Sequence, residues 1–543
     1  MGRIGYIYFM GVIIRQAAAS DAPRWLELLK ASLGEDYSDK QIYDLSWISS
    51  QLDPKGDVET WVAEANNRLQ ASLAFLPPVA PNSNPVANMG RHFNRPESYA
   101  DGSAEALLGK MNELGTQRKQ LIVSRVFASD NRLQILYENA GYVCVGFQPF
   151  KHMHRVREGV LFYVRASQSG LVTRLPISES LPQISELATV VLSNLGIPNP
   201  LSARDGVTGY PLQTEVKFHD ATLDDFELWR LQAQSTNPPI EISGVFNLGI
   251  GYLRLAGNTP HRAILAQRDD KVVAGLAYYF DPQDRCVRLT DSFSQDDLSM
   301  GGLFQHAVKI AQDQLSAVYL EVDVLATAPR LLKSAEQVGF VPIAYLPAFF
   351  SKEGHYTDVV KLVKLNMVYS QENATFTAKA RAIVEIIDHN FHDQKVGVAI
   401  INLLRGLPIF EGLGDGELRK IARLFTQKLY RPGEKIFNKG DSGHEAYVVM
   451  RGQVDIVLEE KGKPIATIGN GQIFGELAFL DGAARVAMAV ASQASIVLVV
   501  QRSAFNVLAQ REPHLGMMVM RNVAMELSNR LRRSNVAMAS SRK

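Results

Sequence analysis

The chain contains only two cysteines, Cys144 and Cys286, among 543 residues. Two thiols are too few for a disulfide framework or a cysteine-based zinc site, and this usage is typical of proteins kept in a reducing compartment. The sequence also lacks an apolar run of about 20 residues, the length that a bilayer-spanning helix needs. The apolar stretch at residues 4–14 is better explained as a first strand than as an export signal. We therefore expect a cytoplasmic protein with no membrane partner.

An excess of charge is missing as well. The 57 basic and 56 acidic residues leave a net charge of +1. Nothing in this balance favours nucleic acid or an anionic membrane as a partner. The length allows three or four domains, and 46% hydrophobic and 21% charged residues are typical of a globular protein.

The pattern with the clearest chemistry lies near the C-terminal end of the sequence. Gly475 and Glu476 begin a short helical run, where free backbone N–H groups and the helix dipole attract an anion. Arg485 follows Glu476 by nine residues, and its guanidinium can pair with a phosphate bidentately. The Glu476 carboxylate can accept hydrogen bonds from sugar hydroxyls. The spacing predicts a nucleotide pocket in which ribose and phosphate belong to one small ring.

These residues resemble the phosphate-binding cassette of cyclic nucleotide-binding domains, of the catabolite activator protein and protein kinase A regulatory subunit type. Further motifs of that family occur in order upstream, at Leu407–Leu413, Tyr430–Phe437, Lys439–Gly443 and Ala446–Val454. The resemblance covers residues 403–533 and implies a β-roll with flanking helices. It implies cAMP as an effector, with Glu476 on the ribose 2′-hydroxyl and Arg485 on the cyclic phosphate. The expected site also includes Gly475, Leu477, Ala478 and Val486.

The cassette departs from the family pattern around the arginine. Many members have a proline before it and a serine or threonine within the next three residues, where this chain has Ala484, Val486 and Met488. A lost hydrogen bond weakens binding by about 0.5–1.5 kcal/mol, and by more with a charged partner. Two interpretations remain: a weakened site for cAMP or cGMP, or a cassette that is kept only as a fold element.

Residues 12–166 and 213–366 form an internal repeat. Each copy has a strand leading into a helix, a hairpin around a polar turn, and a strand–helix–strand unit that ends on Gly-aromatic-Val. The matching segments are Ile14–Asp21 with Phe218–Asp225, Val62–Phe75 with Leu265–Tyr278, and Gly141–Val143 with Gly339–Val341. This alternation predicts two α/β (α+β) sandwiches, each around a mixed sheet.

Each copy resembles the GNAT acyltransferase superfamily, and the likeness is closest at Ser129–Tyr142. The resemblance implies that Asn131 contacts the pantetheine arm of acetyl-coenzyme A and that Tyr137 protonates the departing thiolate. A phenol with a pKa near 10 suits that general-acid role. The family's cofactor loop is matched only in part by Tyr99–Ala104, where Gly102 and Ala104 fit but Asp101 adds a negative charge.

The second copy departs further from the acyltransferase pattern. Its loop at Leu298–Leu303 is partial, and Pro329 and Ala335 stand at the Asn and Tyr positions. We expect this copy to be a degenerate partner that is structural or that gathers a ligand.

No motif singles out a general base among Glu64, His92, His152 and His154. The cluster Lys151–Arg155 has two interpretations, a contact with a coenzyme A phosphate or an exposed hairpin. No spacing typical of a metal site occurs.

The predicted domain order follows from these assignments. It comprises copy one (1–166), a connector (167–212) with a helix near Ile184–Leu195, copy two (213–366), a helical linker (367–402), the nucleotide-binding segment (403–533) and a tail (534–543). Because the sequence contains no helix-turn-helix after the nucleotide-binding segment and no positive excess, we do not expect a transcription factor.

The expected function is a cyclic nucleotide-regulated N-acyltransferase. It would transfer acetyl or another acyl group from a coenzyme A thioester to an amine, with a lysine of a protein substrate as the first candidate acceptor. The rival is a non-catalytic sensor or scaffold whose acyltransferase folds bind a ligand or a protein partner. A third interpretation is an enzyme whose cassette no longer binds nucleotide. A homodimer formed through the last helix is left open.

Overall fold

The structure is a computed structural model. It describes residues 7–9, 11–37, 40–76, 86–118, 121–153, 156–166, 171, 174–197, 201–204, 206–213, 215–234, 240–242, 261–352, 354–367, 369–371, 373–459 and 462–540. The chain divides into two compact units, Met1–Asp388 and His389–Lys543, and the division falls within helix α10 (Ala378–Arg405). Each unit is described by itself.

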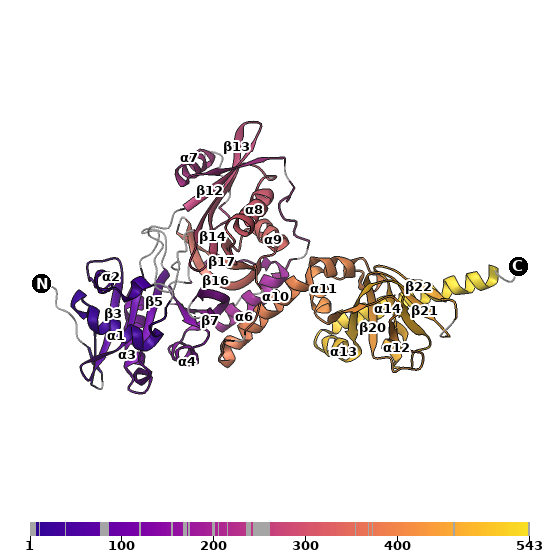
Figure 1. Cartoon of the computed structure of the whole chain (residues 1–543), viewed down its shortest axis with the longest axis horizontal. Helices are drawn as coiled ribbons and strands as arrows, with labels where there is room; N and C mark the ends of the chain where they lie inside the picture. The colour runs from indigo at the N-terminus through magenta and orange to yellow at the C-terminus, as the bar shows by residue number, and fades with distance from the viewer. Residues whose placement is uncertain are drawn as a thin grey trace. The chain divides into compact units, whose positions relative to one another are not determined.

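The first unit is built on one sheet of 15 strands that runs through both repeats (Figure 1). The first half contributes, in spatial order, β1 (Ile7–Phe9), β2 (Val12–Gln16), β3 (Glu59–Ala65), β4 (Arg68–Leu76), β5 (Val86–Asn94), β6 (Leu121–Phe127), β8 (Arg157–Arg165) and β7 (Val143–Met153). The second half continues with β16 (Val341–Lys352), β17 (His355–Leu365), β15 (Tyr319–Leu325), β14 (Cys286–Ser294), β13 (Lys271–Asp281), β12 (His261–Arg268) and β11 (Lys217–Ala221).

Helices cover this sheet in each half. They are α1 (Ala22–Leu33), α2 (Leu45–Gln51), α3 (Ser103–Gln117) and α4 (Asn131–Asn139) in the first half, and α7 (Leu223–Gln234), α8 (Met300–Lys309) and α9 (Pro329–Gln337) in the second. The predicted connector helix is present as α6 (Pro182–Asn194), and it packs on β7 and β16. Apolar positions face the sheet: Trp25, Leu28 and Leu29 of α1 are all at most 1% exposed.

The two halves share their strand order and their unusual backbone positions. Each contains one parallel pair, β5–β6 in the first half and β14–β15 in the second. The turns predicted at Asn66-Asn67 and Asp269-Asp270 both have two residues with positive φ, as a tight hairpin turn requires. The repeat inferred from the sequence is therefore present in the strand order. The acyltransferase likeness and the domain boundaries stay predictions, because a single sheet joins both copies.

The halves meet where β7 pairs with β16. Gly146 of β7 lies opposite Ala344 of β16, and a Cβ on Gly146 would come within 2.2 Å of the Ala344 Cβ and 2.5 Å of the Ile343 carbonyl oxygen. The two backbones approach so closely that only glycine fits at this position.

A buried ionic cluster lies next to this junction. The Lys151 ammonium is 2.9 Å from the Glu321 carboxylate, and the Asp323 carboxylate is 2.6 Å from Arg288 and 2.5 Å from Lys361. All five side chains are at most 3% exposed. Lys151 of the first half is thus paired with a carboxylate of the second.

This burial corrects both interpretations of the basic cluster Lys151–Arg155 for the residues that can be described. The Lys151 and His152 side chains are buried, and Asp284 lies 3.3 Å from the His152 ring. Neither side chain forms an exposed hairpin or is open to a coenzyme A phosphate. His154 and Arg155 lie outside the described residues.

The second unit contains the β-roll predicted for residues 403–533. Two four-stranded sheets enclose a core. The first has the strand order β18 (Phe425–Tyr430), β25 (Ser495–Gln501), β20 (Glu445–Arg451), β23 (Ile473–Phe474). The second has the strand order β19 (Lys435–Phe437), β24 (Met488–Ala491), β21 (Val454–Val457), β22 (Ala466–Ile468). The flanking helices are the end of α10, α11 (Asp415–Ala422), α12 (Glu476–Asp481), α13 (Arg502–Arg511) and α14 (Pro513–Ser540), and Figure 1 shows α12 beside β20. Tyr447, Val449, Phe474, Val497 and Val499 fill the core between the sheets.

Over the described residues, no helix combines the length and the apolar character that a membrane crossing requires.

We predict that Gly146→Val destabilises the first unit, because its side chain would overlap Ala344. Overpacking of this kind costs about 1–3 kcal/mol of unfolding free energy. All four tryptophans of the sequence, Trp25, Trp47, Trp61 and Trp229, lie in the first unit, so tryptophan fluorescence during denaturation reports on that unit alone. Gly109→Ala is the control, since a Cβ there meets nothing within 4 Å. Equal stability of the two variants would contradict the close approach at the junction.

Candidate functional site

The predicted cassette of the second unit is organised around the side chain of Arg485, which is 4% exposed. Its two terminal nitrogens donate to the carbonyl oxygens of Gly475, at 2.8 Å, and Glu445, at 2.7 Å. The guanidinium carbon lies 4.3 Å from the ring centroid of Phe437 and 5.5 Å from that of Tyr447. Backbone acceptors and aromatic rings together fix the orientation of the cation.

Gly475 is required by this arrangement. It precedes α12 with a φ of 75°, and a Cβ there would lie 2.8 Å from a terminal nitrogen of Arg485. The buried Nε of Arg485 has no hydrogen-bond partner among the described residues. A buried N–H without a partner is costly, so an acceptor that reaches it gains free energy. The cassette therefore leaves the Nε–H of Arg485 unused.

The other predicted cassette residues differ in exposure. Glu476 is half-buried as the first residue of α12, and Ala478 is buried against Gly443. Leu477 and Val486 are 50% and 67% exposed. The structure thus brings Gly475, Glu476 and Arg485 to one place, while a role for Leu477 and Val486 in contacting a ligand stays a prediction.

Sequence reasoning missed Glu445, which is a second carboxylate at the cassette. Tyr447 Oη donates a short hydrogen bond to it, and Gln501 Nε2 donates at 2.6 Å. Burial alone would raise the pKa of Glu445, but these hydrogen bonds and the neighbouring Arg485 hold that pKa below its ordinary value. Glu445 therefore stays ionised near Arg485. The sequence did not single out Glu445, because it only directly precedes the motif Ala446–Val454.

In the first half of the first unit, a cleft of about 450 Å³ opens between α3 and α4. Its lining includes Tyr99 before α3, Ala104, Leu108 and Asn112 on α3, and Arg132, Leu136 and Asn139 on α4. The Arg132 guanidinium lies 4.9 Å from the centroid of the Tyr99 ring. Of the residues predicted to bind coenzyme A, only Ala104 lines this cleft.

Gly102 and Asn131 stand at the starts of the two helices. Gly102 precedes α3 with a φ of 77°, and the N–H of Ser103 after it donates to Asp101 Oδ1 at 2.8 Å. The carboxylate of Asp101 thus uses one of the N–H groups that a pyrophosphate would need. Asn131 is exposed as the first residue of α4. Its contact with a pantetheine arm stays a prediction.

Tyr137 lies inside the protein and does not line the cleft. It is 0% exposed, Ser124 Oγ donates to its hydroxyl at 2.9 Å, and His92 Nδ1 lies 3.2 Å from the same oxygen. Burial lowers the pKa of His92 to about 3, so its ring is neutral and can accept a hydrogen bond from the phenolic hydroxyl. The general-acid role of Tyr137 stays a prediction.

Glu64, another candidate for a general base, is already engaged in ion pairs. The Glu64 carboxylate is 2.6 Å from Arg24 and 3.0 Å from Arg15. Burial would raise the pKa of Glu64, but the hydrogen bonds from Arg24 and Arg15 lower it below its ordinary value. A carboxylate held in this way is a weak base.

The corresponding cleft of the second half, between α8 and α9, is filled by the chain itself. A Cβ on Gly301 of α8 would lie 2.4 Å from the Pro211 carbonyl oxygen. The Tyr210 N–H donates to Ser334 Oγ at 2.8 Å, and the Arg330 guanidinium lies 4.2 Å from the Tyr210 ring centroid. We call residues Gly209–Pro211 the strap. The second half therefore does not offer the same opening as the first.

Glu241 anchors the strap by accepting a hydrogen bond from Tyr210 Oη at 2.9 Å. The residue is 7% exposed. Burial raises the pKa of Glu241 to about 7, although the hydrogen bond from Tyr210 and the charge of Arg330 oppose that rise.

Within the described part of the chain, no three His, Cys, Asp or Glu side chains are grouped as a metal site would need.

Comparison with known proteins supports the assignment at the C-terminal end of the sequence. Residues 427–512 match the family model of the cyclic nucleotide-binding domain. The cyclic AMP receptor protein of Thermus thermophilus is 33% identical over 136 residues, which are 24% of this chain and 61% of that protein. The cAMP-dependent protein kinase regulatory subunit of Colletotrichum orbiculare is 35% identical over 104 residues, 19% of this chain and 27% of that protein.

Among solved structures, a cyclic nucleotide-binding domain from Methylobacillus flagellatus matches with a TM-score of 0.25 and 25% identity, over 27% of this chain and 85% of that one. The chain spans less than two thirds of the two curated relatives named above. Together with the family match, these relatives support a cyclic nucleotide-binding domain in the β-roll. They give no support to the acyltransferase resemblance of the first unit.

We predict that Glu241 makes the first unit less stable as pH rises. Because burial raises the pKa of Glu241 from its ordinary value of 4.5 to about 7, the folded chain binds this proton more tightly than the unfolded chain. The stabilisation is complete below about pH 4.5 and is lost as pH rises through about 7, by at most about 3 kcal/mol.

The measurement is tryptophan-monitored denaturation between pH 5 and pH 8 on the full chain, for wild type and Glu241→Gln. The amide of the variant can still accept from Tyr210 but does not titrate, so the stability difference between the two proteins should change with pH. Glu215→Gln, at an exposed position of the same unit, is the control and should follow wild type. A constant difference between wild type and Glu241→Gln would contradict the shifted pKa.

Proposed function

We propose that this protein is a cyclic nucleotide-regulated N-acyltransferase, in which the β-roll binds cAMP and the first half of the first unit transfers an acyl group from a coenzyme A thioester to an amine. The observation that carries the regulatory part is the cassette of Gly475, Glu476 and Arg485, within a segment that matches the nucleotide-binding family. The acceptor that we propose is a lysine side chain of a protein substrate.

The cassette offers complementary groups to the two polar parts of a cyclic nucleotide. The unused Nε–H of Arg485 is a charged donor for a cyclic phosphate oxygen, and it adds to the attraction of the free N–H groups that begin α12. The Glu476 carboxylate, next to Gly475, would accept from the ribose 2′-hydroxyl. The aromatic rings beneath Arg485 keep its guanidinium in place while the phosphate binds.

The α3–α4 cleft is the proposed place for the thioester, and its residues fit such a ligand only in part. Arg132 supplies a cation for its phosphates, while Asp101 and Glu105 oppose them. In the proposed reaction, the acceptor amine attacks the thioester carbonyl and the C–S bond breaks as Tyr137 protonates the sulfur that leaves. The proton that the amine loses then restores the phenol of Tyr137. Since Tyr137 is 0% exposed, this step requires a displacement of α4.

A covalent and hydrogen-bonded path leads from the linker to α4. Gln134 Nε2 donates to the Thr375 carbonyl at 2.8 Å, the Thr377 N–H lies 3.2 Å from Gln134 Oε1, and the Thr377 hydroxyl donates to Glu138. The residue after Thr377 is the first of α10, which continues into the second unit. A shift of α10 on nucleotide binding would therefore act directly on the helix that carries Tyr137. Such coupling requires that the nucleotide bind the two states with different affinity.

A second candidate function is a non-catalytic cyclic nucleotide sensor whose first unit is a scaffold. The full burial of Tyr137 and the use of the Ser103 N–H by Asp101 favour it. In that case the α10–α4 contacts would relay nucleotide binding to a protein partner rather than to a reaction.

For nucleotide binding, we predict a gain of affinity for Val486→Ser. The position is 67% exposed beside Arg485, and the new hydroxyl can donate to the cyclic phosphate. One added hydrogen bond to a charged group strengthens binding by about 1.5–3 kcal/mol, or roughly 10- to 100-fold. Calorimetric titration of the full chain with cAMP and cGMP measures the effect. The control Val486→Ala separates the effect of the new hydroxyl from the effect of losing the branched side chain. Absence of nucleotide binding in both wild type and Val486→Ser would reject the nucleotide site.

For acyl transfer, we predict that Tyr137→Phe lowers turnover by about 100-fold or more, as is common when a general acid is removed. Mass spectrometry follows acyl transfer from acetyl-coenzyme A to lysine-containing proteins, with and without cAMP. Tyr142→Phe is the matched control, because its ring centroid lies only 4.8 Å from that of Tyr137 and it has no proposed role in the chemistry. Unchanged turnover in Tyr137→Phe would exclude the general-acid role, and binding of cAMP without binding of acetyl-coenzyme A would favour the sensor.

A further inference from the structure

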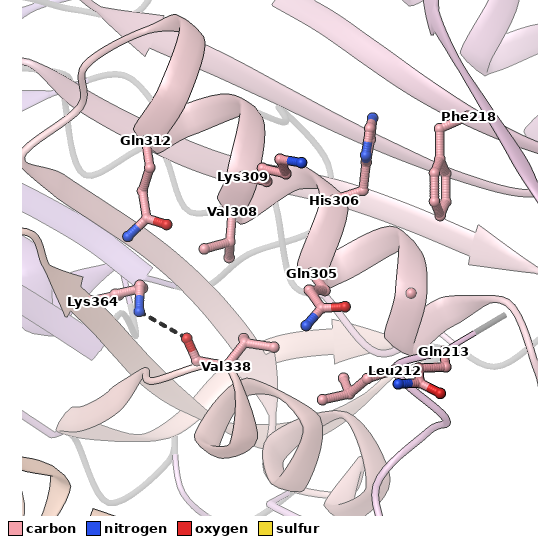
Figure 2. Close-up of a pocket in the computed structure, with 11 residues that line it drawn as sticks. Leu212, Gln213, Phe218, Gln305, His306, Val308, Lys309, Gln312, Val338 and Lys364 are labelled. Atoms are coloured by element: carbon pink, nitrogen blue, oxygen red, sulfur yellow. Dashed lines mark hydrogen bonds between the residues drawn. The ribbon is translucent and has the colours of Figure 1, made fainter.

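The second half of the first unit has a pocket of about 590 Å³ that is separate from the sites above. Figure 2 shows its lining, which comes from three elements: Gln305, His306 and Lys309 lie on α8, Phe218 on β11, and Lys364 on β17. None of its 11 lining residues is an aspartate or a glutamate. The pocket therefore has cationic and neutral polar groups without a compensating carboxylate in its wall.

Among the described residues, no carboxylate neutralises either of the two lysines, Lys309 and Lys364. In the described part of the chain, neither the Lys309 nor the Lys364 ammonium has a carboxylate within ion-pair distance. Lys364 donates one hydrogen bond, to the Val338 carbonyl oxygen at 2.9 Å, as Figure 2 shows. Burial lowers the pKa of Lys364, and no acidic group opposes that shift. A partly desolvated ammonium without a counter-ion is stabilised by an anion that reaches it.

One side of the pocket is aromatic. The Phe218 and His306 rings stack on each other with centroids 4.3 Å apart and an interplanar angle of 14°. Desolvation lowers the pKa of His306, with Lys309 acting in the same direction and Asp220 against it. Asp220 itself does not line the pocket. Together with Leu212, Val308 and Val338, the stacked pair offers an apolar surface beside the cations.

The strap limits what can enter. Gly209–Pro211 closes the space between α8 and α9, and Leu212 and Gln213, which follow it, form part of the pocket wall. An extended ligand such as a coenzyme A thioester cannot continue from this pocket along α9. The volume still lies within the range of about 300–1,000 Å³ that is typical of small-molecule sites.

We propose that this pocket binds a small organic phosphate monoester, with the phosphate at Lys309 and Lys364 and the organic part against Phe218 and the apolar wall. A phosphate monoester carries a charge of about −1.5 to −2 near neutral pH, which matches two ammonium groups. The amides of Gln305 and Gln312 can donate to its remaining oxygens. This site is independent of the nucleotide cassette and of the α3–α4 cleft.

The test is calorimetric titration of the full chain with phenyl phosphate, inorganic phosphate and benzoate, on wild type, Lys309→Gln, Lys364→Gln and Lys271→Gln. We expect phenyl phosphate to bind more tightly than inorganic phosphate or benzoate. Each of the first two substitutions should weaken it at least about tenfold, because each removes a hydrogen bond from a charged group. Lys271→Gln replaces an exposed lysine of the same half, outside the pocket, and should bind like wild type.

Lys364→Arg keeps the positive charge, so it should bind phenyl phosphate more tightly than Lys364→Gln. Both variants should retain the tryptophan-monitored stability of wild type, which excludes a folding defect as the cause of weaker binding. The proposal is overturned if phenyl phosphate does not bind, if binding is equal in wild type and both glutamine variants, or if benzoate binds as tightly. Failure of cAMP binding in a separate titration would leave these outcomes unchanged, so the two proposals are tested independently.

Discussion

The first unit depends on a set of charges buried where its two halves join. Lys151 comes from the first half, while Glu321, Asp323, Arg288 and Lys361 come from the second, and all are within ion-pair distance of a partner. Removing one member of such a set leaves an uncompensated buried charge, which costs about 3–5 kcal/mol. The pair of Lys151 with Glu321 joins the two halves and favours the pairing of β7 with β16. Because that pairing fixes the two halves to each other, it also fixes the position of both helix-lined clefts on the sheet.

A continuous sheet has a consequence for regulation. Within the first unit, β7 and β8 hold α4 from one side, and the segment before α10 contacts it from another through Gln134 and Glu138. Phe376 of the same segment packs edge-on against Phe147 of β7, with centroids 5.2 Å apart. The segment before α10 thus contacts both the sheet and α4. Under the regulation proposed above, a shift of α10 would act on α4, which borders the cleft of about 450 Å³ on its α3 side.

Local patterns predicted the parts of the structure that local chemistry determines. Two polar residues between alternating apolar runs, at Asn66-Asn67 and Asp269-Asp270, are enough to place a hairpin, and the ordered motifs of the β-roll are enough to place its strands. Contacts between distant segments were outside the reach of such patterns. Lys151 looked like part of an exposed cluster, because the carboxylate that pairs with it, Glu321, lies 170 residues further along the chain. Arg485 was predicted at the site, but not that backbone carbonyls and aromatic rings would bury it. No sequence pattern predicted the strap, Gly209–Pro211, because the composition of a connector does not show which cleft the connector will fill.

The repeated halves have thus diverged where a ligand would enter rather than in their framework. The same face of the corresponding helices lines both pockets: positions 105, 108, 109 and 112 of α3 follow the same spacing as 302, 305, 306 and 309 of α8. In the first half this face carries Glu105 and Asn112 opposite Arg132, whereas in the second it carries His306 and Lys309 beside Lys364. Charge of both signs suits a ligand with several polar groups, while a wall with lysines and no acidic side chain selects a compact anion. The strap reinforces this difference by shortening the second pocket. A repeated framework with two such different pockets is better suited to binding two different ligands than to binding the same ligand in both halves.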